Sequence, residues 1–269
     1  MLFRSVTYPL QTLARNAPLI RSMVRRDIQG RYRGSMGGTA WTLLHPLLLM
    51  GAYYFVFGVV LGVRFGAGQS SGDFLLYFIC GMLPWLAFSE AVGRAPGIVL
   101  ENTSFVKRVI FPLEILPVNL TLTSLVAEGF GLLIFLGFLI FTGPGLGWTN
   151  LALPLVLIPQ VMFTMGLCWF LSALGVFLRD TSQVIGLALT IWMFCTPIFY
   201  PASALPPNLL WLFEKNPLYL IVQMYRNIFL NGTLPAAFPL AVLWAMGLAA
   251  FWFGHSWFYK VKKSFADLL

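Results

Sequence analysis

Charged residues are scarce in this sequence. Only 10% of its 269 residues are Asp, Glu, Lys or Arg, 59% are hydrophobic, and the mean hydropathy is +0.82. Soluble proteins average roughly 25% charged residues, so a soluble domain of ordinary composition is excluded. We interpret the chain as an integral membrane protein. At about 20 apolar residues for each helical crossing, its length allows about six spans joined by short connections.

Motifs that carry enzymatic chemistry are also missing. The three cysteines lie inside apolar runs without paired spacing, which excludes a disulfide framework and predicts small core residues; they are Cys80, Cys168 and Cys195. No Gly-Lys dipeptide occurs, so the chain has no Walker A loop, and no H-E-x-x-H or D-x-D pattern is present. We therefore expect no catalytic residues, no metal site and no cofactor in this chain, which is not predicted to be an enzyme.

Six apolar segments predict an all-α membrane protein with six transmembrane helices. They are residues 41–63, 74–91, 113–141, 151–178, 184–200 and 238–258. If the N-terminus is cytoplasmic, 14 of the 17 Lys and Arg residues fall on the cytoplasmic side, as membrane topology favours. Both termini are thus predicted to be cytoplasmic. The net charge of +8 then follows from topology and requires no nucleic-acid partner.

The N-terminal segment, residues 1–35, has the pattern of an amphipathic interfacial helix. Apolar residues recur at helical spacing at Ile20, Met23, Val24 and Ile28, with arginines between them. Such a helix lies in the membrane interface, where its arginines contact anionic lipid headgroups. The arginines and the absence of a clean apolar run over the first 33 residues argue against a cleaved signal peptide.

The connection over residues 201–235 is unusually apolar and is broken by five prolines. Its two apolar halves, 208–213 and 217–230, are each too short to cross a bilayer at about 1.5 Å per residue. The pattern predicts a re-entrant helical hairpin on the outer face, with its turn covered by protein. An interfacial helix lying on the bilayer is the alternative.

A second unusual segment, "ENTSFVKRVIFPLEILPVNL", lies in the cytoplasmic connection between the second and third predicted spans. A short helix here would have an apolar side formed by Phe105, Val106, Val109 and Ile110. Lys107 and Arg108 would form its charged side. A half-apolar helix of this kind suits docking into a groove of a soluble partner. Resting among the lipid headgroups is the other possibility.

Three stretches together resemble the permeases of polysaccharide-exporting ABC transporters. "RDIQGRYRGSMGGTAWTLLHPLLLMGAYYFVFG" is similar to the opening that joins their interfacial helix to the first span, and "SFVKRVIFPLEILP" to their coupling segment. "TPIFYPASALPPNLLWLFEKNPLYLIVQMYR" is similar to their external gate region. The three matches stand in the same order as in the family and extend over almost the whole chain.

The resemblance implies a multi-pass protein of the bacterial cytoplasmic (inner) membrane. Residues 1–269 would form a single transmembrane permease domain, with a coupling helix at 101–112 and an external re-entrant gate at 201–235. The permease would be a homodimer served by two copies of a separate ATPase subunit, which binds the ATP and Mg²⁺. The substrate implied is an undecaprenyl-pyrophosphate-linked polysaccharide, with O-antigen as the first choice and teichoic acid or capsular polymer as alternatives.

By the same resemblance, nine consecutive residues would dock into the ATPase: Thr103, Ser104, Phe105, Val106, Lys107, Arg108, Val109, Ile110 and Phe111. Arginines of the N-terminal segment could bind the lipid pyrophosphate through forked hydrogen bonds, although anchoring to the inner membrane face also explains them; they are Arg25, Arg26, Arg31 and Arg33.

Aromatic residues make up 16% of the chain. Aromatic faces present apolar planes to sugar C–H groups, so a polymer can slide over them, although lipid-belt anchoring and core packing compete with this role. The candidates for a polysaccharide channel and gate are Tyr53, Tyr54, Phe57, Trp85, Trp192, Phe199, Tyr200, Trp211 and Tyr225. Glu128 lies near the middle of the third predicted span, where a carboxylate usually faces the bundle interior.

Two other functions remain open on the sequence. A drug or ion exporter with the same architecture would not depend on a glycan lipid, so accumulation of lipid-linked polymer in a deletion strain would argue against it. A polymer-synthesising membrane enzyme would transfer sugar without an ATPase.

The docking interpretation of the segment 103–111 predicts the effect of two substitutions. Replacing both Val109 and Ile110 by Asp should abolish export and release the ATPase, because charge on the apolar side of the helix prevents its burial in the partner. The permease should still insert into the membrane. Co-purification with the ATPase measures this, and retained binding would contradict the docking assignment.

Overall fold

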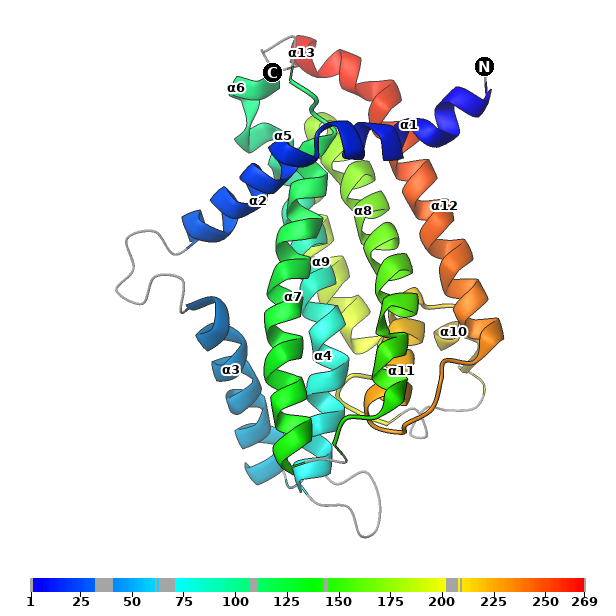
Figure 1. Ribbon diagram of the computed structural model, residues 1–269. Helices are drawn as coiled ribbons and strands as arrows, with labels where there is room; N and C mark the ends of the chain where they lie inside the picture. The colour runs from blue at the N-terminus through cyan, green and yellow to red at the C-terminus, as the bar shows by residue number, and fades with distance from the viewer. Residues whose placement is uncertain are drawn as a thin grey trace.

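The computed structural model describes residues 2–31, 41–60, 62, 71–106, 111–142, 145–201, 208 and 210–268. Every regular element within these ranges is helical, which confirms the predicted all-α class. Long helices run side by side in a bundle, and shorter helices cover its two ends (Figure 1).

Four helices are long and apolar enough to cross a membrane. They match the second, third, fourth and sixth predicted spans. They are α4 (Ser71–Arg94), which continues through η3 (Ala95–Gly97) and α5 (Ile98–Glu101); α7 (Ile115–Thr142); α8 (Leu153–Phe177), preceded by η4 (Trp148–Ala152); and α12 (Ala237–Val261), followed by η7 (Lys262–Ser264).

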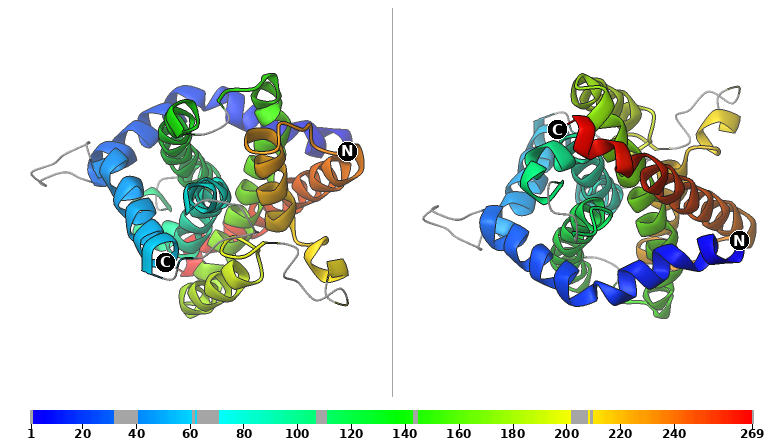
Figure 2. Two further views of the ribbon diagram at one scale, coloured as in Figure 1. Left: turned by 90° about the horizontal axis from the view of Figure 1, so that it is seen from below. Right: turned by 90° about the horizontal axis from the view of Figure 1, so that it is seen from above.

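The first and fifth predicted spans correspond to shorter apolar helices. Residues 41–60 form α3 (Trp41–Tyr53) and the π-helix η2 (Tyr54–Val60), and α9 (Thr181–Phe194) has 14 residues. At 1.5 Å per residue, α9 is about 21 Å long, less than the roughly 30 Å hydrocarbon core. The six-span count therefore stays a prediction. Viewed along the bundle, α4 lies near the centre, whereas α3 and α9 lie at the periphery (Figure 2).

The N-terminal segment forms α1 (Leu2–Arg15) and α2 (Ala17–Arg31), which cross one end of the bundle (Figure 1). As the spacing predicts, Ile20 and Met23 are buried, and α2 packs mainly on α7. Tyr8 joins α1 to α12 through ring contacts with His255 and Tyr259. The same end carries α5, α6 (Thr103–Val106) and α13 (Phe265–Leu268), so both terminal helices lie at one end of the bundle.

The opposite end carries α10 (Leu210–Phe213) and α11 (Pro217–Phe229) (Figure 1). Asn216 caps α11, since its side-chain Oδ1 accepts a hydrogen bond from the Leu218 amide at 3.0 Å. Pro217 fits the first helical turn, where a missing N–H is harmless. The helix packs against α4, α8 and α12, and most of its side chains are buried. This burial argues against a helix that merely lies on the bilayer.

The most extensive contact between two helices of the described residues joins α8 to α12. A Cβ atom on Gly254 would collide with the carbonyl of Gly166, and one on Gly247 would lie 2.7 Å from the carbonyl oxygen of Pro159. Small residues at such positions let two membrane helices approach until their backbones touch. The close packing of α8 and α12 therefore depends on glycine.

The prediction for the cysteines holds for two of the three. Cys80 and Cys168 are buried, but Cys195 is exposed. Cys195 directly follows the last residue of α9, where the chain turns ahead of Pro197. Because it lies at this turn and not within the helix, it is exposed although its sequence neighbours are apolar. It is the one exposed thiol of the chain.

The α8–α12 contact predicts a large difference between two glycine substitutions. Gly254→Ala should destabilise the protein by about 1–3 kcal/mol, because the new methyl group meets backbone that cannot move aside. Gly137→Ala on α7 is the matched control, since nothing lies within 4 Å of the added Cβ. Thermal unfolding in detergent would show a lower midpoint for Gly254→Ala only. Equal midpoints would contradict the packing account.

Candidate functional site

The central helix of the bundle connects its two ends. Residues Phe74–Glu101 form one continuous helical run, and 72% of its apolar window is buried inside the protein, against 22–44% for the other three long helices. At about 1.5 Å per residue this run of 28 residues is about 42 Å long. Gly175 of α8 packs against Pro96, where a Cβ would collide with the carbonyl. This helical run, which we call the α4 rod, leads directly into the predicted coupling segment.

The predicted coupling segment begins with α6, and two aromatic rings from its two ends pack against each other. The Phe105 and Phe111 rings stack with centroids 4.4 Å apart and planes 9° from parallel. Both rings are half-buried against the core, whereas Ser104 is exposed and Thr103 is half-buried. The side chain of Val106 and residues 107–110, which include Lys107, Arg108, Val109 and Ile110, lie outside the described residues. The stack therefore fixes both sides of the segment to the bundle.

A partly buried ion pair lies just beyond this segment. The Lys262 ammonium is 3.0 Å from each Glu114 carboxylate oxygen, and the Glu114 side chain is only 5% exposed. The Trp169 indole N–H donates to the Glu114 carbonyl at 2.9 Å. These contacts join the beginning of α7 to α8 and to the end of α12. The chain just after the coupling segment is thus held by two other helices.

The arginine cluster of the N-terminal segment lies at the same end. Arg25 and Arg26 are exposed on α2, whereas the Arg31 side chain and Arg33 lie outside the described residues. Asp27 forms a salt bridge with Arg94 at the end of α4, with 3.3 Å between Nη1 and Oδ2. A hollow of about 490 Å³ is lined by Ala17, Pro18, Arg21, Ser22 and Arg25. Arg21 thus lies beside Arg25, and the anion-binding role of these arginines stays a prediction.

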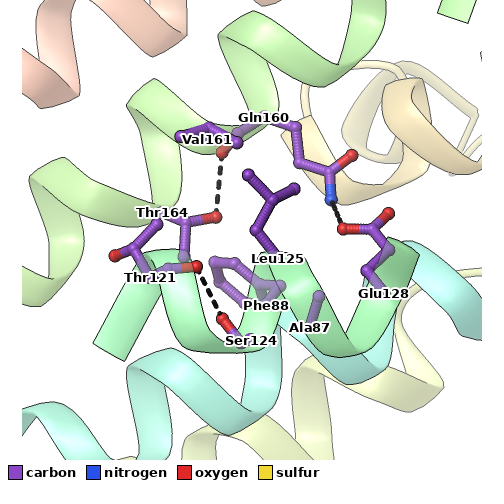
Figure 3. Close-up of a pocket in the computed structure, with 9 residues that line it drawn as sticks. All are labelled: Ala87, Phe88, Thr121, Ser124, Leu125, Glu128, Gln160, Val161 and Thr164. Atoms are coloured by element: carbon purple, nitrogen blue, oxygen red, sulfur yellow. Dashed lines mark hydrogen bonds between the residues drawn. The ribbon is translucent and has the colours of Figure 1, made fainter. Parts of the chain in front are cut away.

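The intramembrane acid Glu128 is fully enclosed and has two partners. Gln160 Nε2 donates to Glu128 Oε2 at 2.9 Å (Figure 3). The Tyr225 hydroxyl donates to Glu128 Oε1 at 2.7 Å. The same hydroxyl lies 3.0 Å from Gln160 Oε1. These three residues come from α7, α8 and α11. We call them the Glu128 network, and it supplies the partners that the sequence could not identify for Glu128.

A small cavity lies beside this network. Its lining is polar along one side, with Thr121 and Ser124 of α7 facing Thr164 of α8 (Figure 3). The volume is about 10 Å³, which is room for one water molecule and not for a sugar ring. The network thus joins helices inside one chain, and the cavity beside it is no conduit for a polymer.

The predicted channel aromatics occupy different environments. Trp211 is exposed, and the Lys215 ammonium lies 5.1 Å from its ring centroid. Half-buried positions are found for Tyr53, Trp192, Phe199 and Tyr200. The side chains of Tyr54 and Phe57 lie outside the described ones. Trp85 and Tyr225 are buried among helices of the same chain, so neither presents a surface to a polymer in this conformation, and their role in a channel stays a prediction.

Several residues of the site were not singled out from the sequence. Gln160, Glu114, Lys262 and Asn216 belong to it, and Asn216 accepts a hydrogen bond from the Trp192 indole at 2.9 Å. Gln160 carried a usable signal, because a polar side chain in the middle of an apolar segment usually faces a partner helix. The others lie at helix ends, where polar residues are ordinary.

Comparison with known proteins places this architecture in a family. Residues 18–230 match the family described as ABC-2 type transporter. A Klebsiella pneumoniae protein named O-antigen export system permease protein RfbA is 30% identical over 257 residues, covering 93% of this chain and 95% of the relative. A Myxococcus xanthus protein of the same name is 31% identical over 251 residues, covering 93% and 94%. The chain belongs to the ABC-2 type transporter family, as a multi-pass membrane protein.

Proposed function

We propose that the chain is the permease subunit of an exporter that moves a lipid-linked polysaccharide across the bacterial cytoplasmic membrane. The first-choice substrate is O-antigen. The observation that carries this proposal is the similarity, over 93% of the chain, to proteins named as O-antigen export permeases. The three resembling motifs support it, because they fall at the interfacial helix, the coupling segment and α11.

The energy for export comes from a partner. The chain lacks a Walker A loop, so two copies of a separate ATPase subunit would bind ATP and Mg²⁺. The segment 103–111 would dock into each ATPase copy. Its attachment supports this role: the stacked rings of Phe105 and Phe111 fix its base, and the α4 rod leads from it through the bundle.

The membrane orientation follows from charge. The bundle end that carries α1, α2, α6 and α13 also carries most of the basic residues, and the opposite end carries α10 and α11. The positive-inside rule places the first end in the cytoplasm and the second on the outer face. In this orientation the chain crosses six times, with α3–η2 and α9 as the two short crossings. The buried helix α11 re-enters from outside, where protein covers it.

Two copies of the chain would meet along the peripheral helices. α9 buries Thr181 and packs Leu189 and Trp192 on the core, but its other side exposes large apolar residues at helical spacing, namely Val184, Leu187, Ile191 and Phe194. α3–η2 likewise exposes Leu44, Leu47, Leu48 and Phe55. A homodimer that places these helices around a shared axis would form the conduit between the two chains.

The polymer would reach this conduit from the side. The hollow at the start of α2 contains Arg21 and Arg25, whose guanidinium groups suit the pyrophosphate of an undecaprenyl carrier. The neighbouring Arg26 is exposed, and Arg31 and Arg33 follow in sequence. The lipid would approach beside α2 and the first span, with its chain remaining in the membrane. The aromatic track would then comprise Tyr53, Tyr54, Phe57, Trp192, Phe199, Tyr200 and Trp211.

The proposal predicts a stable complex. The chain, co-expressed with the ATPase encoded beside it, should co-purify in detergent and hydrolyse ATP in a vanadate-sensitive manner. A strain lacking the chain should lose surface polymer and accumulate lipid-linked glycan inside. Absence of a complex with any neighbouring ATPase, or sugar transfer by the chain alone, would contradict the proposal. Accumulated teichoic acid or capsule precursor would redirect the substrate assignment within the same family.

The Glu114–Lys262 pair predicts a charge-swap result. Glu114→Lys or Lys262→Glu alone should lower export for each ATP hydrolysed, because like charges then meet where the chain leaves the coupling segment. Each should also cost about 1–3 kcal/mol of stability through an unpaired buried charge. The double swap should recover much of both losses. The exposed Lys263 offers a control, Lys263→Glu, with little effect. Additive losses in the double variant would contradict a coupling role for the pair.

A further inference from the structure

Arg226 is a buried cation at the outer end of the bundle. It lies on α11, and only 2% of its surface is exposed. The topology predicted from the sequence places it among the three basic residues of the outer connections, where a solvated side chain would be ordinary. Burying a guanidinium is costly unless its donors are satisfied. The groups that accept hydrogen bonds from this guanidinium therefore indicate its role.

The guanidinium joins three segments of the chain. Nε donates to the Tyr77 carbonyl at 3.4 Å, Nη1 to the Pro197 carbonyl at 2.7 Å, and Nη2 to the Ile198 carbonyl at 3.2 Å. The guanidinium carbon also lies 3.4 Å from the Tyr77 ring centroid. Tyr77 belongs to α4, and residues 197 and 198 follow α9. One planar side chain thus fixes α11, the outer end of the α4 rod and the segment after α9.

The sequence of α4 leaves space for this side chain. A Cβ atom on Gly81 would lie 2.8 Å from Arg226 Nη2 and 3.3 Å from Val222. Any residue larger than glycine would therefore push the guanidinium away from its carbonyl partners. Gly81 and Arg226 form one fitted contact between α4 and α11.

A second contact ties the end of α9 to the other end of α11. The Asn216 amide nitrogen donates to the Cys195 carbonyl at 3.2 Å and to Thr196 Oγ1 at 3.1 Å. Asn216 joins only α9 and α11, however, whereas Arg226 also reaches α4. α4 also touches this region directly, since the ring centroids of Phe78 and Phe199 are 5.4 Å apart. Arg226 adds a polar contact that couples a displacement of the α4 rod to both α11 and the segment 195–198.

We propose that Arg226 is a positioning residue that makes the outer end of α4, the segment 195–198 and α11 move as one unit. The inference rests on the proposed function, because the α4 rod begins at the coupling segment. ATP-driven movement of that segment would shift the α4 rod, and the Arg226 contact would carry the shift to the outer end of α9, beside the conduit. Export would then depend on Arg226 even though it touches no polymer.

Cys195 supplies a reporter without any engineered cysteine. Its thiol is exposed, while Cys80 and Cys168 are buried, so a nitroxide spin label added to the purified permease, before the ATPase is bound, should attach at Cys195. In the wild-type complex, the label spectrum should change when ATP and vanadate are added. In Arg226→Met, the label should become more mobile, the nucleotide response should disappear and export should be lost, while ATP hydrolysis persists.

Three further variants test the geometry. Arg226→Lys keeps the charge but cannot reach three carbonyls, so its label mobility should be intermediate. Gly81→Ala keeps Arg226 but displaces its guanidinium, so it should also raise the label mobility. Arg226→Lys and Gly81→Ala replace Arg226→Met in the test if Arg226→Met does not fold. Thr233→Ala removes an exposed side chain from the same outer connection and should have no effect.

Unchanged label mobility and an intact nucleotide response in Arg226→Lys and Gly81→Ala would overturn the inference. Label mobility in the isolated permease separates this outcome from a failure of the proposed function. If the variants loosen Cys195 but no ATPase binds the wild-type chain, the Arg226 contact stands as a structural link and its role in transport is refuted.

Discussion

The Glu128 network is the interaction on which the position of α11 in the bundle depends. A bilayer offers no water to a buried polar group, so each such group must find its partner within the protein. Glu128 of α7 meets Gln160 of α8 and Tyr225 of α11 at 2.7–2.9 Å. α11 has only 13 residues and cannot cross the membrane. Its place in the bundle therefore depends on side contacts with longer helices.

Neighbouring residues hold α11 from two sides. Tyr225 reaches α7 and α8, and Arg226 reaches α4 and the segment after α9. The α4 rod, in turn, runs from these contacts to the predicted coupling segment. Polar contacts at the two ends of one central helix thus give the permease a physical connection between the two ends of its bundle. The glycine-mediated contact between α8 and α12 forms a separate rigid support.

Much of the fold could be predicted from hydrophobic periodicity. The four long helices and the amphipathic α2 follow directly from the sequence, because length and spacing are local properties. The partners of Glu128 could not be found this way, since Gln160 and Tyr225 lie 32 and 97 positions further along the chain. Arg226 was counted as an outer-face charge, because a charge count cannot distinguish a solvated arginine from a buried one. The same holds for Trp85 and Tyr225, which are buried in this structure. The sequence alone does not distinguish an aromatic side chain in a helix core from one that lines a conduit.

The most direct test of the account is a double-mutant cycle between Glu128 and Tyr225, measured as unfolding free energy in detergent or bicelles. The variants are Glu128→Leu, Tyr225→Phe and both together. If the network holds α11 in place, the two residues should show a coupling energy of about 1 kcal/mol, within the range measured for hydrogen bonds between membrane helices. If the two single losses add to within about 0.3 kcal/mol, the residues act independently, and α11 must be held by other contacts.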